Sequence, residues 1–178
     1  LFKRLREFEW VEPIHETVRL SPIIFDSDVT ITHLPEKSHT DRDLQNFRSQ
    51  IEKGKTLSDR LRNIYAKELF VSGGEEDFLQ AEAYFTELAD GSELSMDQLK
   101  EAICVIVKAA AIRKDTVKFF RYAMKDIASE GVSEVCFELG DFYFGIGEYE
   151  EAAMWFYNAA YETGSILNIH YSGDLPLK

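Results

Sequence analysis

Apolar residues recur every three or four positions through most of the chain, as they do on the buried face of an amphipathic helix. This pattern begins near Thr40, and glycines mark the end of most of the segments that carry it. The clearest start signal is Ser95 followed by Gln98, because the two side chains can satisfy free backbone N–H groups reciprocally. The expected helices cover residues 41–53, 58–71, 77–89, a stretch that begins at 95, and residues 115–129, 133–145 and 149–163.

The first 36 residues follow a different pattern. Apolar and polar residues alternate over residues 8–12 and 28–32, which is typical of short strands. All four prolines lie near the ends of the chain, and none interrupts the helical part between Pro35 and Pro176. The sequence therefore predicts a mainly α protein, with a short β-containing segment at residues 1–40 and a helical domain at residues 41–178.

The helical part shows internal self-similarity. Its last third matches the tetratricopeptide pattern, in which small residues let paired helices approach and aromatic residues fill the space between them. Small second-helix residues at 81, 116 and 152 and aromatic residues at 85, 120 and 156 share spacings of about 35 residues. These positions predict a tetratricopeptide-like helical hairpin solenoid of about three repeats, and a generic array of helical hairpins is the alternative. The best-matching copy contains Leu139, Gly140, Tyr143, Gly147, Ala152, Phe156 and Ala159.

The amino-acid composition limits the classes of partner that this chain is expected to bind. The 178 residues carry a net charge of -12, and 45% of them are hydrophobic, which is enough for a packed core. Negative charge repels phosphate backbones and anionic lipids, so we expect neither nucleic acid nor membrane as a partner. No apolar run approaches the length of a membrane span, and Cys104 and Cys136 lie in apolar helical patterns as buried, reduced thiols. A cytoplasmic protein is the expectation.

The N-terminal segment carries the only residues that suggest chemistry. Its succession of motifs resembles the end of the catalytic domain in family 2 glycosyltransferases, which include enzymes that glycosylate cysteine in bacterial peptides. The resemblance covers about 36 residues, and Arg48, Asp59, Arg60 and Tyr65 look like the start of the tetratricopeptide tail of these enzymes. The matching motifs are Leu1-Phe2-Lys3-Arg4, Phe8-Glu9-Trp10, His15-Glu16 and Asp28-Val29-Thr30-Ile31-Thr32-His33.

The resemblance implies a parent enzyme that uses a nucleotide-sugar donor and a divalent metal, Mg²⁺ or Mn²⁺. It would place His15 and Glu16 as catalytic residues in the acceptor loop, His33 near the metal, and Trp10 against a sugar ring. From the residues alone, a surface His-Glu pair, a hydrogen-bonded strand end and a core aromatic are the alternatives. The donor-binding half, in which an Asp-x-Asp pair follows several βα units, is missing, and the chain begins at Leu1 rather than Met. We therefore expect a fragment that binds no cofactor and is inactive alone.

The sequence is compatible with two main functions. The chain is either a C-terminal fragment of a glycosyltransferase, whose repeats bind an acceptor or form a homodimer, or a stand-alone tetratricopeptide scaffold that binds a peptide and catalyses nothing. A generic helical regulator is a third, less favoured alternative. In the first two cases the repeat register places Phe137, Asp141 and Phe144 on the inner face, as candidate binding residues for a peptide or protein acceptor. The alternative for the two phenylalanines is packing against a further repeat that begins near Pro176.

Overall fold

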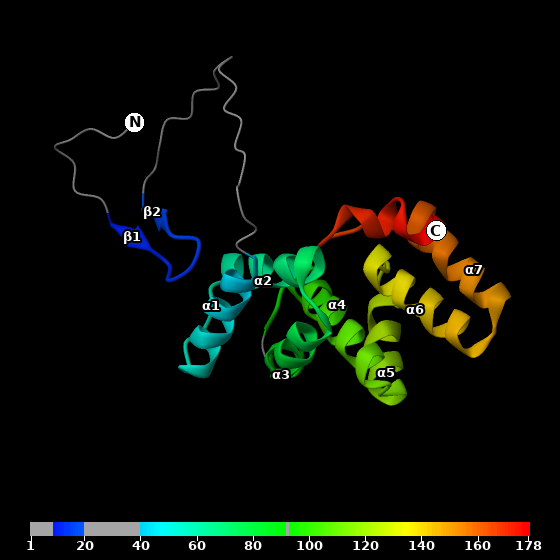
Figure 1. Ribbon diagram of the computed structural model, residues 1–178, viewed down its shortest axis with the longest axis horizontal. Helices are drawn as coiled ribbons and strands as arrows, with labels where there is room; N and C mark the ends of the chain where they lie inside the picture. The colour runs from blue at the N-terminus through cyan, green and yellow to red at the C-terminus, as the bar shows by residue number, and fades with distance from the viewer. Residues whose placement is uncertain (1–8, 20–39, 92) are drawn as a thin grey trace, which may run out of the picture.

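The computed structural model describes residues 9–19, 40–91 and 93–178, and this part of the chain is mainly helical (Figure 1). After the helices, the chain continues in a π-helical turn and two short 3₁₀ helices. A two-stranded antiparallel hairpin, β1 and β2, precedes the helices. The elements are β1 (Trp10–Val11), β2 (Thr17–Val18), α1 (Thr40–Glu52), α2 (Asp59–Ser72), α3 (Glu75–Gly91), α4 (Met96–Arg113), α5 (Thr116–Ile127), α6 (Ser133–Ile146), α7 (Tyr149–Tyr157), η1 (Asn158–Glu162), η2 (Ile169–Ser172) and η3 (Leu175–Leu177).

The predicted helices are confirmed, and most of their ends lie within two residues of the expected positions. The signals that define the ends are local, which explains this accuracy. Ser95 and Gln98 form the expected reciprocal cap at the start of α4. The last helix differs from expectation, because its α-helical part ends at Tyr157 and the rest of the predicted segment is the π-helical turn η1.

The helices follow one another along the long axis of the molecule, from α1 at one end to α7 at the other (Figure 1). Helix α4 lies at the centre, because α2 and α6 contact it on two sides and α3 and α5 also pack against it. Its residues 102–107, 109 and 110 are all buried. A helix that is buried on every side needs apolar or small residues all around, and α4 has them.

The alanines that the repeat pattern singled out lie inside the protein, whereas the small residue of the middle copy does not. Ala81, Ala152 and Ala159 are buried, as expected, but Thr116 is exposed. Among the aromatic positions, Phe85 is buried, whereas Phe120 and Phe156 are half-buried. The close approach of helices that the pattern predicts is therefore present at these alanines.

The N-terminal hairpin corrects the expected pair of strands. Strand β1 pairs with Thr17–Val18, a strand too short to be predicted, and Trp10 lies opposite Val18. The turn between them uses positive φ angles at Glu12 and His15, which residues other than glycine seldom adopt. The strand expected at residues 28–32 lies outside the described residues.

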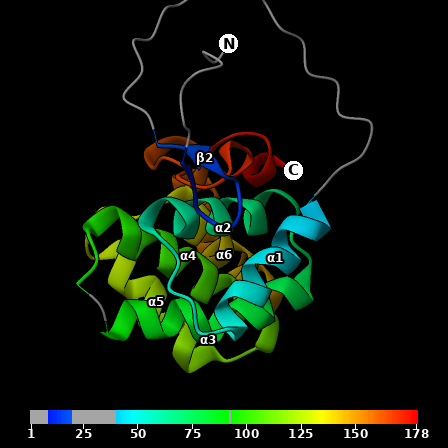
Figure 2. The ribbon, with the colours of Figure 1, turned by 90° about the vertical axis from the view of Figure 1, so that its left-hand side faces the viewer.

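The C-terminal residues 164–178, here called the C-terminal strap, fold back over the helices (Figures 1 and 2). Glu134 at the start of α6 is fully buried, and its carboxylate accepts the backbone N–H groups of residues 166, 167 and 168. The Asn168 side-chain amide donates to the carbonyl of Phe70 at 2.8 Å. The Tyr171 ring contacts Phe70 and Phe137. The strap thus joins α2 to α6.

Asp126, near the end of α5, makes stability depend on pH. The residue is 1% exposed, and one carboxylate oxygen accepts the Val132 N–H at 2.9 Å. Burial raises the pKa of Asp126 to about 6, although the Val132 N–H and Lys100 oppose the shift. The folded state therefore holds its proton more strongly than the unfolded state does, and stability falls as pH rises from about 4 to about 6.

We expect Asp126→Asn to flatten this part of the pH profile, because asparagine keeps the acceptor for Val132 and does not ionise. Urea unfolding at several pH values between 4 and 7 measures the slope. Asp97→Asn, at an exposed position in the first turn of α4, is the control and should leave the slope unchanged. Parallel profiles for the natural chain and Asp126→Asn would contradict the assignment.

Candidate functional site: two cavities beside helix α6

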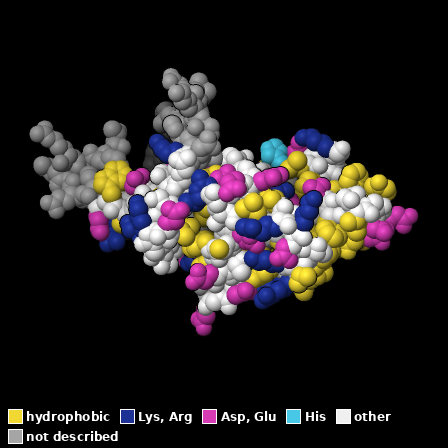
Figure 3. Space-filling view, turned by 60° about the horizontal axis from the view of Figure 1, so that its bottom comes forward, with side chains coloured by type: hydrophobic (Ala, Val, Ile, Leu, Met, Phe, Trp, Pro, Cys, Tyr) yellow, Lys and Arg dark blue, Asp and Glu magenta, His cyan; other side chains and the backbone are white. Residues whose placement is uncertain are grey.

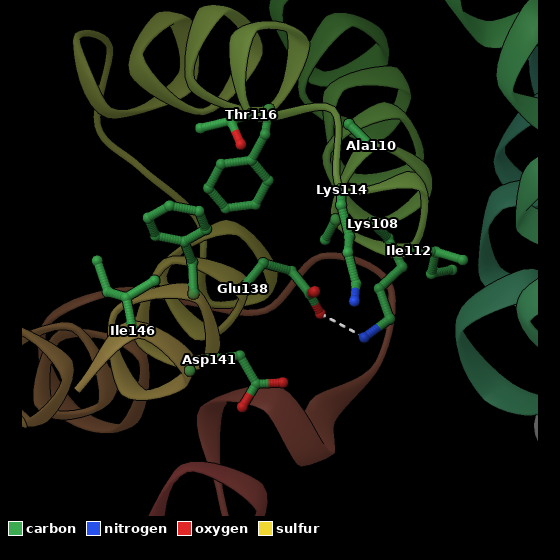
Figure 4. Close-up of a pocket in the computed structure, with 12 residues that line it drawn as sticks. Lys108, Ala110, Ile112, Lys114, Thr116, Glu138, Asp141 and Ile146 are labelled. Carbon is green, nitrogen blue, oxygen red and sulfur yellow. Dashed lines mark hydrogen bonds and ion pairs between the residues drawn. The ribbon is translucent and has the colours of Figure 1, made fainter. Parts of the chain in front are cut away.

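The first cavity, here called the inner cavity, has a volume of about 530 Å³ and lies between α4, α5 and α6 (Figure 4). Its wall is largely apolar, and four charged side chains join it. Phe119 and Phe142 stack with their ring centroids 5.3 Å apart and form one side. The lining residues are Lys108, Ala110, Ala111, Ile112, Lys114, Thr116, Phe119, Glu138, Asp141, Phe142, Gly145 and Ile146.

Two of the four charges neutralise each other. Lys108 Nζ donates to Glu138 Oε1 at 2.7 Å, and the Glu138 side chain is almost completely buried. Burial acts to lower the pKa of Lys108, but Glu138 and its other anionic neighbours outweigh it, so the pKa rises. Burial raises the pKa of Glu138, and Lys108 offsets part of that shift. The ion pair is a fixed part of the cavity wall.

The other two charges are available to a ligand. Asp141 and Lys114 are both exposed, and they take part in no ion pair within the part of the chain that the structure describes. Lys114 follows α4 in a left-handed backbone conformation, and its side chain extends along the inner cavity (Figure 4). A ligand would thus meet a cation on one side of the inner cavity and an anion on α6.

The second cavity, here called the end cavity, lies between α6, α7 and η3, on the face of α6 next to the inner cavity, and measures about 580 Å³. Half-buried Phe137 packs against Phe156, with ring centroids 5.4 Å apart. Phe144 is 59% exposed and meets the ring of Tyr149 edge-on. The lining residues are Phe137, Asp141, Phe144, Tyr149, Ala152, Ala153, Phe156, Leu175, Pro176 and Lys178.

The structure brings together the three candidate binding residues of the inner face. Phe137, Asp141 and Phe144 all line the end cavity, and Asp141 lines both cavities. Their role in binding stays a prediction. Residues 175–177 form the 3₁₀ helix η3, and Pro176 lines one side of the end cavity. Packing of the two phenylalanines against a further repeat after Pro176 stays a prediction.

Exposed apolar side chains gather at the end of the molecule that α6 and α7 form (Figure 3). An apolar surface of this kind marks a contact site more often than a freely solvated face. The repeat register indicated only Phe144 of this surface, because it points to the inner face of first helices and most residues of this surface lie on α7 and η1. The exposed residues there are Phe144, Ile146, Tyr149, Met154, Tyr157 and Tyr161.

The residues that the glycosyltransferase resemblance singled out lie elsewhere. The half-buried His15 ring stacks on Phe47 of α1, with centroids 6.1 Å apart, and its Nε2 has no partner among the described residues. Glu16 is exposed in the same turn, and Trp10 is 66% exposed on β1. His33 lies outside the described residues. Catalytic and metal roles for these residues stay predictions.

Glu12 holds the hairpin to the helices, a role that no sequence signal indicated. Its carboxylate accepts hydrogen bonds from Ser58, the cap of α2, and from Arg60. Arg60 also donates to the carbonyl of His15 at 3.2 Å. The arrangement anchors the turn on α2. Within the residues that the structure describes, no group of three or more His, Cys, Asp or Glu side chains could hold a metal ion.

Cys104 and Cys136 are buried and free, as expected. Burial raises the pKa of Cys136 to about 11 and that of Cys104 well above its usual range. Both remain protonated at neutral pH, and a thiol in that state is a poor nucleophile. They act as small core residues.

The chain matches no known protein-family model, no curated protein and no solved structure. Among the described residues, no helix is both long and apolar enough to cross a bilayer.

Proposed function

We propose that the helical part of the chain is a protein-interaction module that binds an extended peptide segment across α6. The observation that carries this proposal is the pair of largely apolar cavities on adjacent faces of one helix, with Asp141 on the ridge between them. Apolar cavities with few charged groups are typical of binding sites, because the apolar walls supply affinity and the charges supply orientation. The module catalyses nothing by itself.

We further propose that the array is a tetratricopeptide-like solenoid. Helices α2, α4 and α6 are the first helices of the three sequence repeats, and α4 contacts both of the others. The repeated small residues at Ala81 and Ala152 are buried where second helices pack. In a solenoid the first helices form one continuous face, which suits an extended ligand.

A displayed library of random peptides tests binding. We expect peptides with apolar anchors to be enriched on the natural chain and lost on an Ile146→Glu variant, because a carboxylate at the edge of the inner cavity opposes an apolar anchor. Individual peptides should bind the variant about tenfold more weakly, which corresponds to one missing apolar contact of about 1.4 kcal/mol.

Met96→Glu provides the matched control. Met96 and Ile146 are both 58% exposed, so the two substitutions remove equally accessible apolar side chains. Met96 lies at the start of α4, outside both cavities, and its replacement should leave peptide binding unchanged. Failure to enrich any peptide, or equal binding to the natural chain and Ile146→Glu, would exclude the module as proposed.

The second candidate function is that of the end of a glycosyltransferase with its repeat tail, in which the peptide would be the acceptor. The observation that favours it is the exposure of Trp10 on a two-stranded hairpin. A hairpin of this size is marginal alone, and an exposed tryptophan on it suits contact with a sugar or with a larger sheet. Nucleotide-sugar donor and divalent metal would then bind to the parent enzyme outside the described residues.

A further inference from the structure

Asp141 occupies a special position among the acidic residues of this chain. It is the one residue that lines both the inner and the end cavity, and it sits on the exposed ridge of α6. The neighbouring Glu138 is taken up by Lys108, so Asp141 is the carboxylate of this ridge that a ligand can reach. A ligand that fills both cavities must pass over it.

The spacing of the two cavities restricts the shape of such a ligand. They open on adjacent faces of α6 and meet at Asp141, and a helix with its side chains is about 10–12 Å wide. An extended chain rises about 3.3 Å per residue, so residues i and i+4 are about 13 Å apart and can reach from one cavity across Asp141 into the other. Side chains i, i+2 and i+4 of an extended chain point the same way. The middle side chain then faces Asp141.

The charges around the two cavities indicate which kind of side chain the ligand carries at its middle position. A carboxylate exposed at the rim of two apolar cavities favours a cation, and the net charge of -12 attracts basic segments at long range. Lys114 extends along the inner cavity and disfavours a second cation there. The anchor on that side is therefore apolar rather than basic.

We infer that the ligand of this surface is an extended peptide with the pattern apolar-x-basic-x-apolar, whose Arg or Lys pairs with Asp141 while the two apolar side chains enter the two cavities. The inference rests on the proposed function and adds its ligand class. The side chain of Asp141 selects the central residue, and Phe142 and Ile146 on one side and Phe137 and Phe144 on the other receive the anchors.

The test uses three peptides that differ only at the centre. The first is acetyl-Gly-Leu-Thr-Arg-Thr-Leu-Gly-amide, and the others carry norleucine or Glu in place of Arg. Calorimetric titration of the full chain should show the arginine peptide binding tightest. Asp141→Asn should weaken that peptide about fivefold, the upper range for an exposed ion pair, and leave the norleucine peptide unchanged.

Charge reversal separates a direct contact from damage to the fold. Asp141→Lys should prefer the glutamate peptide over the arginine peptide, a gain that a misfolded chain would not show. Glu93→Gln removes one negative charge, as Asp141→Asn does, but from an exposed position outside both cavities. This variant should bind all three peptides as the natural chain does.

The results distinguish this inference from the proposed function. Equal affinity of the arginine peptide for the natural chain and Asp141→Asn overturns the ligand class, even where Ile146→Glu still weakens peptide binding as expected. No binding of any of the three peptides also overturns it, while peptides of another pattern selected from the library would leave the module itself standing.

Discussion

Replacing Glu134 with alanine is expected to lower the free energy of unfolding by about 3 kcal/mol or more, because each buried N–H left without an acceptor costs about 1–3 kcal/mol. Glu134 is fully buried, and its Oε1 accepts three successive N–H groups at 3.0, 2.8 and 3.0 Å. Alanine would leave all three backbone N–H donors without an acceptor and would also leave a cavity. Chemical denaturation measures the loss.

Two further variants show that the carboxylate holds the C-terminal strap. Glu134→Gln keeps one oxygen acceptor in nearly the same volume, so it should cost clearly less than the alanine variant. Glu130→Ala removes a largely exposed carboxylate from the same loop region and should cost little. Hydrogen exchange at residues 166–168 should accelerate in Glu134→Ala alone. An alanine variant as stable as Glu130→Ala would exclude this role.

The C-terminal strap explains how distant parts of the chain hold together. Asn168 and Phe70 are 98 residues apart in sequence, yet the amide of one bonds the carbonyl of the other. The ring of Tyr171 lies against Phe70 of α2 and Phe137 of α6. In a linear array each hairpin contacts only its neighbours, so these contacts add cooperativity between the first and the last hairpin.

The positions of the helices could be predicted because their signals are local. The apolar period of α4 and its Ser95 cap lie within a few residues of each other. Strand β2 could not be predicted, because two residues carry no usable period and its turn depends on positive φ at Glu12 and His15. The 28–32 strand and His33 lie beyond the described residues.

The part of the candidate site that lies on the single helix α6 could be predicted from the sequence. The part that depends on how helices pack against each other could not. The repeat register placed Phe137, Asp141 and Phe144 on a common face, and they do line one cavity. The inner cavity depends on how far α4 and α6 stand apart, which no sequence period encodes. In the sequence, Glu134 looks like any acidic residue at the start of a helix, because the backbone N–H groups that it binds lie more than 30 residues away.

A leucine at Gly140 is expected to destabilise the protein by about 3 kcal/mol, the upper range for overpacking. A Cβ atom at this position would lie 2.6 Å from the ring of Phe156, which is closer than real Cβ atoms approach. Gly140 is buried where α6 meets α7. Gly140→Ala should already cost about 1 kcal/mol or more, despite the better helix propensity of alanine. Thermal and urea unfolding measure both variants.

Gly145 on the same helix is the matched control, because nothing lies within 4 Å of the Cβ that Gly145→Ala would add. That substitution should stabilise the helix by about 0.5–1 kcal/mol, so the two alanine variants should shift stability in opposite directions. Phe156→Leu removes the ring that Gly140→Ala would strike. The double variant should therefore be more stable than the sum of the two single losses predicts. Strict additivity would mean that the ring of Phe156 is not what excludes a side chain at residue 140.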